Sequence, residues 1–88
     1  MRKDDFKALS MPEQGMELMS KGKHLTQLRR GEFLLNLYSI GDFFVEVYYS
    51  VKSNVITKIE IVTDLTKIDQ YIDANAKDNK LEGKVSLN

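Results

Sequence analysis

The chain has 88 residues, no cysteine, and 13 basic against 13 acidic side chains, so its formal net charge is zero. A chain of this length forms one small domain, residues 1–88. The lack of cysteine excludes disulfides and thiolate metal sites. Zero net charge argues against nucleic acid as a partner, because phosphate binding needs a concentrated positive field.

The N-terminal part of the chain predicts one helix. Ser10-Met11-Pro12-Glu13 has the form of a capping box with proline in the first turn. We expect this helix to run to about Lys21 and to stop at Gly22. Upstream, Asp4–Leu9 is expected to form a short turn that presents Phe6 and Leu9. The apolar side of the helix is expected to comprise Met11, Met16, Leu18 and Met19.

The middle of the chain predicts an antiparallel meander. Gly41-Asp42 suits a two-residue hairpin loop with glycine first, and Lys52-Ser53-Asn54 suits a three-residue loop with asparagine in the left-handed region. A third turn is expected at Arg30-Gly31. The strands separated by these turns are His24–Arg29, Phe33–Ile40, Phe43–Ser50 and Val55–Val62.

The two hairpin loops fix a register and therefore two sheet faces. Tyr38 is expected opposite Val45, and Val47 opposite Ile59. Tyr49 is expected opposite Thr57, and Val51 opposite Val55. The first face, which we predict to be the core, comprises Leu34, Asn36, Tyr38, Ile40, Phe43, Val45, Val47, Tyr49, Val51, Val55, Ile59 and Ile61, with Asn36 as its one polar member. The second face comprises Leu28, Phe33, Leu35, Leu37, Phe44, Tyr48, Ile56 and Val62, mixed with Ser39, Glu46, Ser50, Lys58 and Glu60.

A second helix is expected after the sheet. Thr63 or Asp64 would cap it, and it would run from Leu65 to about Ala76. Its apolar stripe is expected to be Leu65, Ile68, Ile72 and Ala76, with Tyr71 at the edge. Residues 77–88 are mostly polar and are expected to form a flexible tail, or a short edge strand if a partner supplies an edge. The predicted fold class is α+β, with a four-stranded antiparallel meander between an N-terminal and a C-terminal helix.

The second face is unusually apolar for a surface. Five exposed large side chains would forgo several kcal/mol, at about 1.5–3 kcal/mol each, and such patches are rare on monomers. One arrangement places a helix on each face. Our leading expectation is instead a homodimer through this face or a sheet edge; the remaining options are the N-terminal helix and a different protein. The predicted interface residues are Phe33, Leu35, Leu37, Phe44, Glu46 and Tyr48.

Glu46 lies in mid-strand among apolar neighbours, opposite Glu60 in the predicted register. Lys58 is diagonal to it, and Arg29 or Arg30 would approach from an edge. We interpret Glu46 as part of an interface salt bridge or a solvated opening. The alternative is a general acid of raised pKa in a pocket that includes Tyr48.

The sequence gives little support for a metal, cofactor or catalytic site. His24 is the only histidine, and the aspartates lack EF-hand spacing, so no metal is expected. Because phosphate-binding, dinucleotide and serine-nucleophile motifs are also missing, we expect no cofactor and no enzymatic activity. The basic residues of the first hairpin, Lys23, Arg29 and Arg30, give an alternative function as a nucleic-acid-associated regulatory module.

The segment from Leu37 to Val62, LYSIGDFFVEVYYSVKSNVITKIEIV, resembles a type of small uncharacterised bacterial protein with the pattern LY-x-x-x-x-F-x-VEV-x-Y. The resemblance implies an α+β fold and an intracellular bacterial origin, and it brings no activity. The N-terminus has no apolar signal segment, and no stretch approaches the roughly 18 apolar residues of a membrane span. We therefore expect a cytoplasmic, non-catalytic interaction module that self-associates or binds a partner protein.

Overall fold

A computed structural model describes residues 1–73 and confirms the predicted α+β class. Its four strands form one antiparallel sheet in the order β1-β2-β3-β4. A helical segment, residues 66–73, follows the sheet; the tail predicted for residues 77–88 and the end of the second helix lie outside the described residues. The labelled elements are α1 (Lys3–Lys7), α2 (Met11–Lys21), β1 (Lys23–Arg30), β2 (Phe33–Ile40), β3 (Phe43–Ser50) and β4 (Val55–Ile61).

The capping box at the start of α2 is confirmed. The Glu13 amide donates to the Ser10 hydroxyl over 3.3 Å, and Oε1 of Glu13 accepts from the Ser10 amide over 2.9 Å. Gly22 ends the helix in an extended conformation. A Cβ atom on Gly22 would lie 2.7 Å from the Leu18 carbonyl oxygen, so the chain leaves α2 by a path that only glycine fits. The upstream turn is the short helix α1, whose Phe6 is fully buried.

The register of the central hairpin is confirmed. Tyr38 pairs with Val45 and Ile40 pairs with Phe43, as the loop at Gly41 requires. Gly41 has a φ of 59°, and a Cβ atom there would lie 2.8 Å from the carbonyl oxygen of Met1. Glycine is therefore needed at this turn for two reasons, its backbone conformation and the close approach of the N-terminal segment.

The register at the start of β4 differs from the prediction. Tyr48 pairs with Lys58, but Tyr49 pairs with Ile56 rather than with Thr57, and the pair predicted between Val51 and Val55 does not form. Thr57 is the extra residue of a β-bulge, and its hydroxyl donates to the Tyr48 carbonyl oxygen over 3.3 Å. The bulge moves Ile56 from the predicted second face to the first face.

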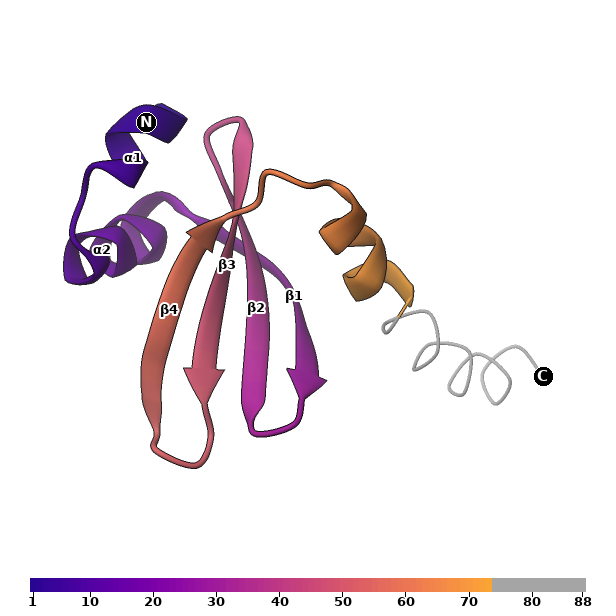
Figure 1. Cartoon of the computed structure of the whole chain (residues 1–88). Coiled ribbons are helices and arrows are strands. Elements are labelled where there is room, and N and C mark those ends of the chain that lie inside the picture. Colours follow the sequence, from indigo (N-terminus) through magenta and orange to yellow (C-terminus); the bar gives the residue numbers. More distant parts are fainter. Residues whose placement is uncertain (74–88) are drawn as a thin grey trace.

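The molecule has three layers. Figure 1 shows α1 and α2 on one side of the sheet and residues 66–73 on the other. Each side has its own buried cluster. The arrangement with a helix on each face, one of the two considered from the sequence, is the one that forms. The first-face cluster comprises Phe6, Leu18, Ile40, Phe43, Val45 and Val47, and the second-face cluster comprises Leu35, Leu37, Val62 and Tyr71.

The N-terminal helices cover only part of the first face. In Figure 1, α1 and α2 lie at the end of the sheet that holds the turn between β2 and β3. Towards the opposite end, Leu34 and Tyr49 are half-buried, and Val51 and Val55, which the predicted register placed in the core, are exposed. With the bulge, Val55 pairs with Ser50 and leaves the first face. The prediction that the whole first face is core is therefore wrong at this end.

Candidate interaction surface

The residues predicted to form an interface lie together on the second face, but residues 66–73 pack on them. Leu35 and Leu37 are buried with Tyr71 in the second-face cluster. Phe33, Phe44 and Tyr48 are half-buried around it. We expected a second molecule on this face because we assumed that the chain leaves the face open. The structure shows that residues 66–73 of the same chain cover the centre of the face.

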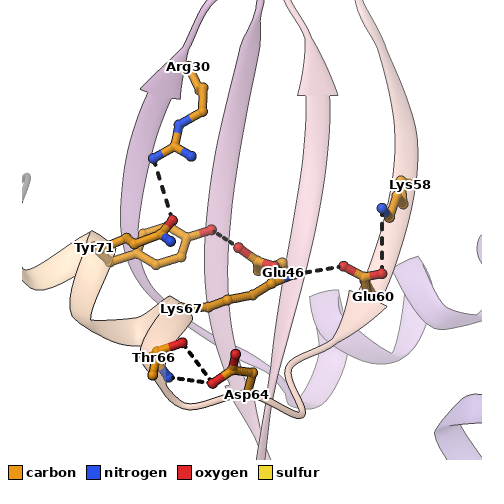
Figure 2. A network of polar contacts seen from close by, with 9 residues as sticks. Arg30, Glu46, Lys58, Glu60, Asp64, Thr66, Lys67 and Tyr71 are labelled. Carbon is orange, nitrogen blue, oxygen red and sulfur yellow. Dashed lines mark hydrogen bonds and ion pairs between the residues drawn. The ribbon is translucent and has the colours of Figure 1, made fainter.

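A buried hydrogen bond holds residues 66–73 to the sheet. The Tyr71 hydroxyl donates to Oε2 of Glu46 over 2.9 Å, and these two residues are 1% and 3% exposed. Figure 2 shows Tyr71 reaching from the helical segment towards Glu46 in the middle of β3. Burial, reinforced by the hydrogen bond to Glu46, raises the pKa of Tyr71 well above its ordinary range, so its hydroxyl stays protonated and donates.

Lys67 joins the two opposed glutamates of the sheet. Glu46 and Glu60 are directly opposite on β3 and β4, as the sequence predicts. The Lys67 ammonium lies 3.4 Å from Glu46 and 3.2 Å from Glu60, and Lys58 lies 3.5 Å from Glu60 (Figure 2). The hydrogen bond to Glu60 is the main cause that raises the pKa of Lys67. Burial acts to raise the pKa of Glu60, but the two ammonium groups outweigh it and lower that pKa.

This network accounts for the burial of the Glu46 carboxylate. Both of its carboxylate oxygens have partners, Tyr71 on one and Lys67 on the other. The predicted salt bridge is thus present, but it lies within the chain, and its cation is Lys67 rather than Arg29 or Arg30. Among residues 1–73, no group of three or more histidine, aspartate or glutamate side chains is arranged to hold a metal ion.

The basic residues of the first hairpin do not converge. Lys23 and Arg30 are at opposite ends of β1, about 23 Å apart at 3.3 Å per residue. Arg29 and Arg30 are successive strand residues and point to opposite faces. Arg29 donates to the Gly31 carbonyl oxygen over 2.6 Å, and Arg30 donates to Gln70 over 3.5 Å. The geometry offers no concentrated positive surface for a nucleic-acid backbone at these three positions.

Asn36, the polar residue of the first face, has polar neighbours on β1. Its Oδ1 lies 2.9 Å from Nε2 of His24 and accepts from Gln27 over 3.0 Å. The His24 ring packs edge-on against Tyr38, with ring centroids 5.1 Å apart. The single histidine is therefore part of a small polar cluster at the edge of the first face.

The open part of the first face forms an apolar groove beside α2. Its volume is about 330 Å³. The sheet supplies the floor and α2 supplies one wall. Met16 and Met19 on that wall are 69% and 89% exposed. The groove is lined by Met11, Pro12, Gly15, Met16, Leu18 and Met19 of α2 and by Tyr38, Val47, Ile56 and Ile59 of the sheet.

Gly15 lines this groove, and the fold does not need glycine there. Nothing lies within 4 Å of a Cβ atom built on Gly15. Glycine in a helix interior costs up to about 1 kcal/mol relative to alanine. The chain thus bears a helix penalty at a position that lines an apolar hollow, and neither backbone conformation nor internal packing explains it.

The sequence predicts one apolar side for α2, and the structure shows that this side does not pack as a unit. Leu18 alone of the predicted apolar side is buried; Met11, Met16 and Met19 are exposed. Met16 is two residues from Leu18, or about 200° around the helix, so the two side chains cannot share a face. The helical angle is thus the signal that Met16 cannot be buried together with Leu18.

Comparison of the chain with protein-family models, curated proteins and solved structures found no match. Within residues 1–73, none of the helices has the length and apolar character needed to cross a bilayer.

Proposed function

We propose that this protein is a non-catalytic interaction module that binds a polypeptide, either its own copy or another protein, in the groove between α2 and the first face of the sheet. The single observation that carries the proposal is the methionine wall of this groove. Met16 and Met19 are the most exposed of the large apolar side chains among residues 1–73, and both lie beside an apolar floor.

Three features support a polypeptide as the bound species. Exposed large apolar patches mark interaction sites on small soluble domains. Methionine is flexible and polarizable, which makes it common at surfaces that adapt to a protein partner. The groove also lies between a helix and a partly uncovered sheet, where an additional helix or extended segment would find apolar contact on two sides.

The interface predicted on the second face is the weaker form of this proposal. Binding at the buried centre of that face requires residues 66–73 to leave the sheet, which would break the Tyr71–Glu46 hydrogen bond and both Lys67 contacts. The groove beside α2 needs no such rearrangement. The nucleic-acid alternative lacks a supporting observation, because Lys23 lies at the opposite end of β1 from Arg29 and Arg30.

Photo-crosslinking tests the proposal independently of the partner's identity. The protein is produced in cells with photo-methionine replacing methionine, the cells are irradiated, and adducts are located by mass spectrometry. We expect intermolecular polypeptide adducts at Met16 and Met19. Met1, which is exposed but outside the groove, is the internal control. Absence of polypeptide adducts at the two groove positions, or equal labelling at Met1, would contradict the proposal.

A further inference from the structure

Resting on the proposed function, we infer that the polypeptide bound beside α2 is an extended segment of a different protein, which adds to the free edge of β4 as a fifth strand. β4 is the last strand in the sheet order, so β3 is its one neighbouring strand among residues 1–73. Backbone hydrogen bonds to the free edge hold the segment. Every second side chain of the segment lies on the first face, where the groove is.

The backbone of β4 is oriented to pair with such a strand. The Val62 amide donates to the Phe44 carbonyl oxygen over 2.9 Å. Hydrogen bonding alternates along an antiparallel strand, so the even-numbered residues at this end of β4 direct their N–H and C=O groups towards β3. Ile59 and Ile61 therefore direct theirs outwards. Each of these two residues offers one donor and one acceptor to an added strand.

Two hollows follow this edge, and both include residues of β4 and of the N-terminal helices. The first is the groove beside α2, to which β4 contributes Ile56 and Ile59. The second has a volume of about 460 Å³ and also includes Ile59, with Ile61, Lys7 and Gln14 around it. Figure 1 shows α1 and α2 on the β4 side of the sheet. An added strand therefore finds space for its first-face side chains at two successive positions.

The chemistry of the two hollows defines the bound segment. The residue of the segment that lies beside Ile59 is apolar, because the groove there is walled by methionine. The residue beside Ile61 is polar, because Lys3, Asp4 and Lys7 line the second hollow. Successive side chains of a strand point to opposite faces, so these two residues are two positions apart. The partner segment thus has an apolar and a polar residue separated by one residue.

The other edge of the sheet suits a partner strand less well. Like charges on an edge strand discourage pairing, and β1 carries Lys23, Arg29 and Arg30. The two charged residues of β4 have opposite signs, and the Lys58 ammonium lies 3.5 Å from the Glu60 carboxylate. The β4 edge therefore presents no excess of either charge to an incoming strand.

A second copy of β4 fits this edge poorly. Two antiparallel copies that use both Ile59 and Ile61 within β4 either include the bulged Thr57 in the new ladder or place Glu60 opposite the Glu60 of the other copy. A bulge disrupts the ladder, and like charges directly opposite each other destabilise it. A strand from a different protein carries neither obstacle.

Photo-methionine crosslinking in cells, applied to the full chain and to variants of the β4 edge, tests this inference. Ile61→Pro removes an outward N–H at a residue outside the groove beside α2, and edge strands tolerate proline at such positions. Polypeptide adducts at Met16 and Met19 are expected to fall at least about fivefold, the usual effect of one lost backbone hydrogen bond. Ile61→Val keeps the N–H and is the matched control, with adducts at the wild-type level.

The adducts also report the conformation of the partner. Partner residues attached to Met16 and to Met19 are expected to be two apart, as on one side of a strand, whereas one side of a helix gives a spacing of three or four. Circular dichroism checks that Ile61→Pro is folded. If it is not, the α-hydroxy acid analogue of isoleucine at residue 61, which replaces only the N–H by oxygen, takes its place.

Three results would overturn the added strand while leaving the proposed function standing. They are a wild-type adduct yield in the folded edge variant, a partner spacing of three or four, and adducts that join two copies of this chain. Absence of polypeptide adducts at Met16 and Met19 of the wild type would overturn both the inference and the proposed function.

Discussion

The Tyr71 hydroxyl and the Glu46 carboxylate meet over 2.9 Å in the interior of the second face. This contact determines how residues 66–73 pack, because Glu46 is a buried charge in the middle of β3 and needs a donor. The helical segment supplies that donor together with the Lys67 ammonium. The covering of the second face is therefore specified by polar contacts as well as by Leu35 and Leu37.

Tyr71→Phe should destabilise the protein by about 1.5–3 kcal/mol, the usual value of a hydrogen bond to a charged group whose partner is then left buried. Urea unfolding followed by circular dichroism measures the change. Combining Tyr71→Phe with Glu46→Leu should cost less than the sum of the two single changes, because no unsatisfied carboxylate remains. Tyr49→Phe on the first face is the control. Additive losses, or a Tyr71→Phe effect equal to the control, would contradict this account.

The same network predicts a loss of stability at alkaline pH. The pKa of Tyr71 is raised from its ordinary 10.0 by burial and then by Glu46, and the pKa of Lys67 is raised from 10.5 chiefly by Glu60. Both groups hold their protons more tightly in the folded chain than in the unfolded chain. Their contribution is thus complete below pH 10 and is lost as the pH rises above the unfolded values.

Thermal unfolding measured from neutral pH to above pH 10 checks this sign. The melting temperature should be level near neutrality and fall at the alkaline end. Tyr71→Phe, although less stable overall, should show a shallower alkaline fall because one of the two groups is gone. An equally steep fall in the variant would show that the raised pKa of Tyr71 contributes nothing.

Two glycines on or next to α2 should respond oppositely to alanine. Gly15→Ala should stabilise the fold by up to about 1 kcal/mol, since its Cβ would meet open space. Gly22→Ala should destabilise it by about 1–3 kcal/mol, because its Cβ would lie 2.7 Å from a backbone oxygen of Leu18. Melting temperatures of the two variants, measured at one protein concentration, provide the test. A shift in the same direction for both would refute the packing described around α2.

The strand order and most of the register were predictable because they depend on local turn chemistry. Gly41-Asp42 fixes the pairing of Tyr38 with Val45 whatever the rest of the chain does. The bulge at Thr57 was not predictable from the same rules. The chain turns over four residues after Ser50, with Asn54 in the left-handed conformation at φ 62°, rather than over the three residues expected. Thr57 is the extra residue between Ile56, which pairs with Tyr49, and Lys58, which pairs with Tyr48. The sheet face that Ile56 occupies therefore depends on the pairing of later residues of β4.

Which side chains of a helix are buried against the sheet depends on the rotation of the helix about its own axis. Hydrophobicity alone does not determine that rotation. The stripe expected for the second helix favoured Leu65 and Ile72, yet both are exposed and Tyr71 is buried. Tyr71 occupies the buried position and donates to Glu46, while Leu65 and Ile72 face solvent. Likewise, grouping Met16 and Met19 with Leu18 on one apolar side of α2 did not predict that the two methionines are exposed beside a groove.

The most direct test of the account is an NMR comparison of the protein labelled with ¹³C at its methionine methyl groups, recorded inside the cells that produce it and at micromolar concentration after purification. The chain has four methionines, of which Met11, Met16 and Met19 line the groove and Met1 does not. The account predicts that the Met16 and Met19 resonances differ between the two samples, because a polypeptide occupies the groove in cells, while that of Met1 stays fixed. Resonances of Met16 and Met19 that are the same in the two samples would contradict the claim that this groove binds a polypeptide.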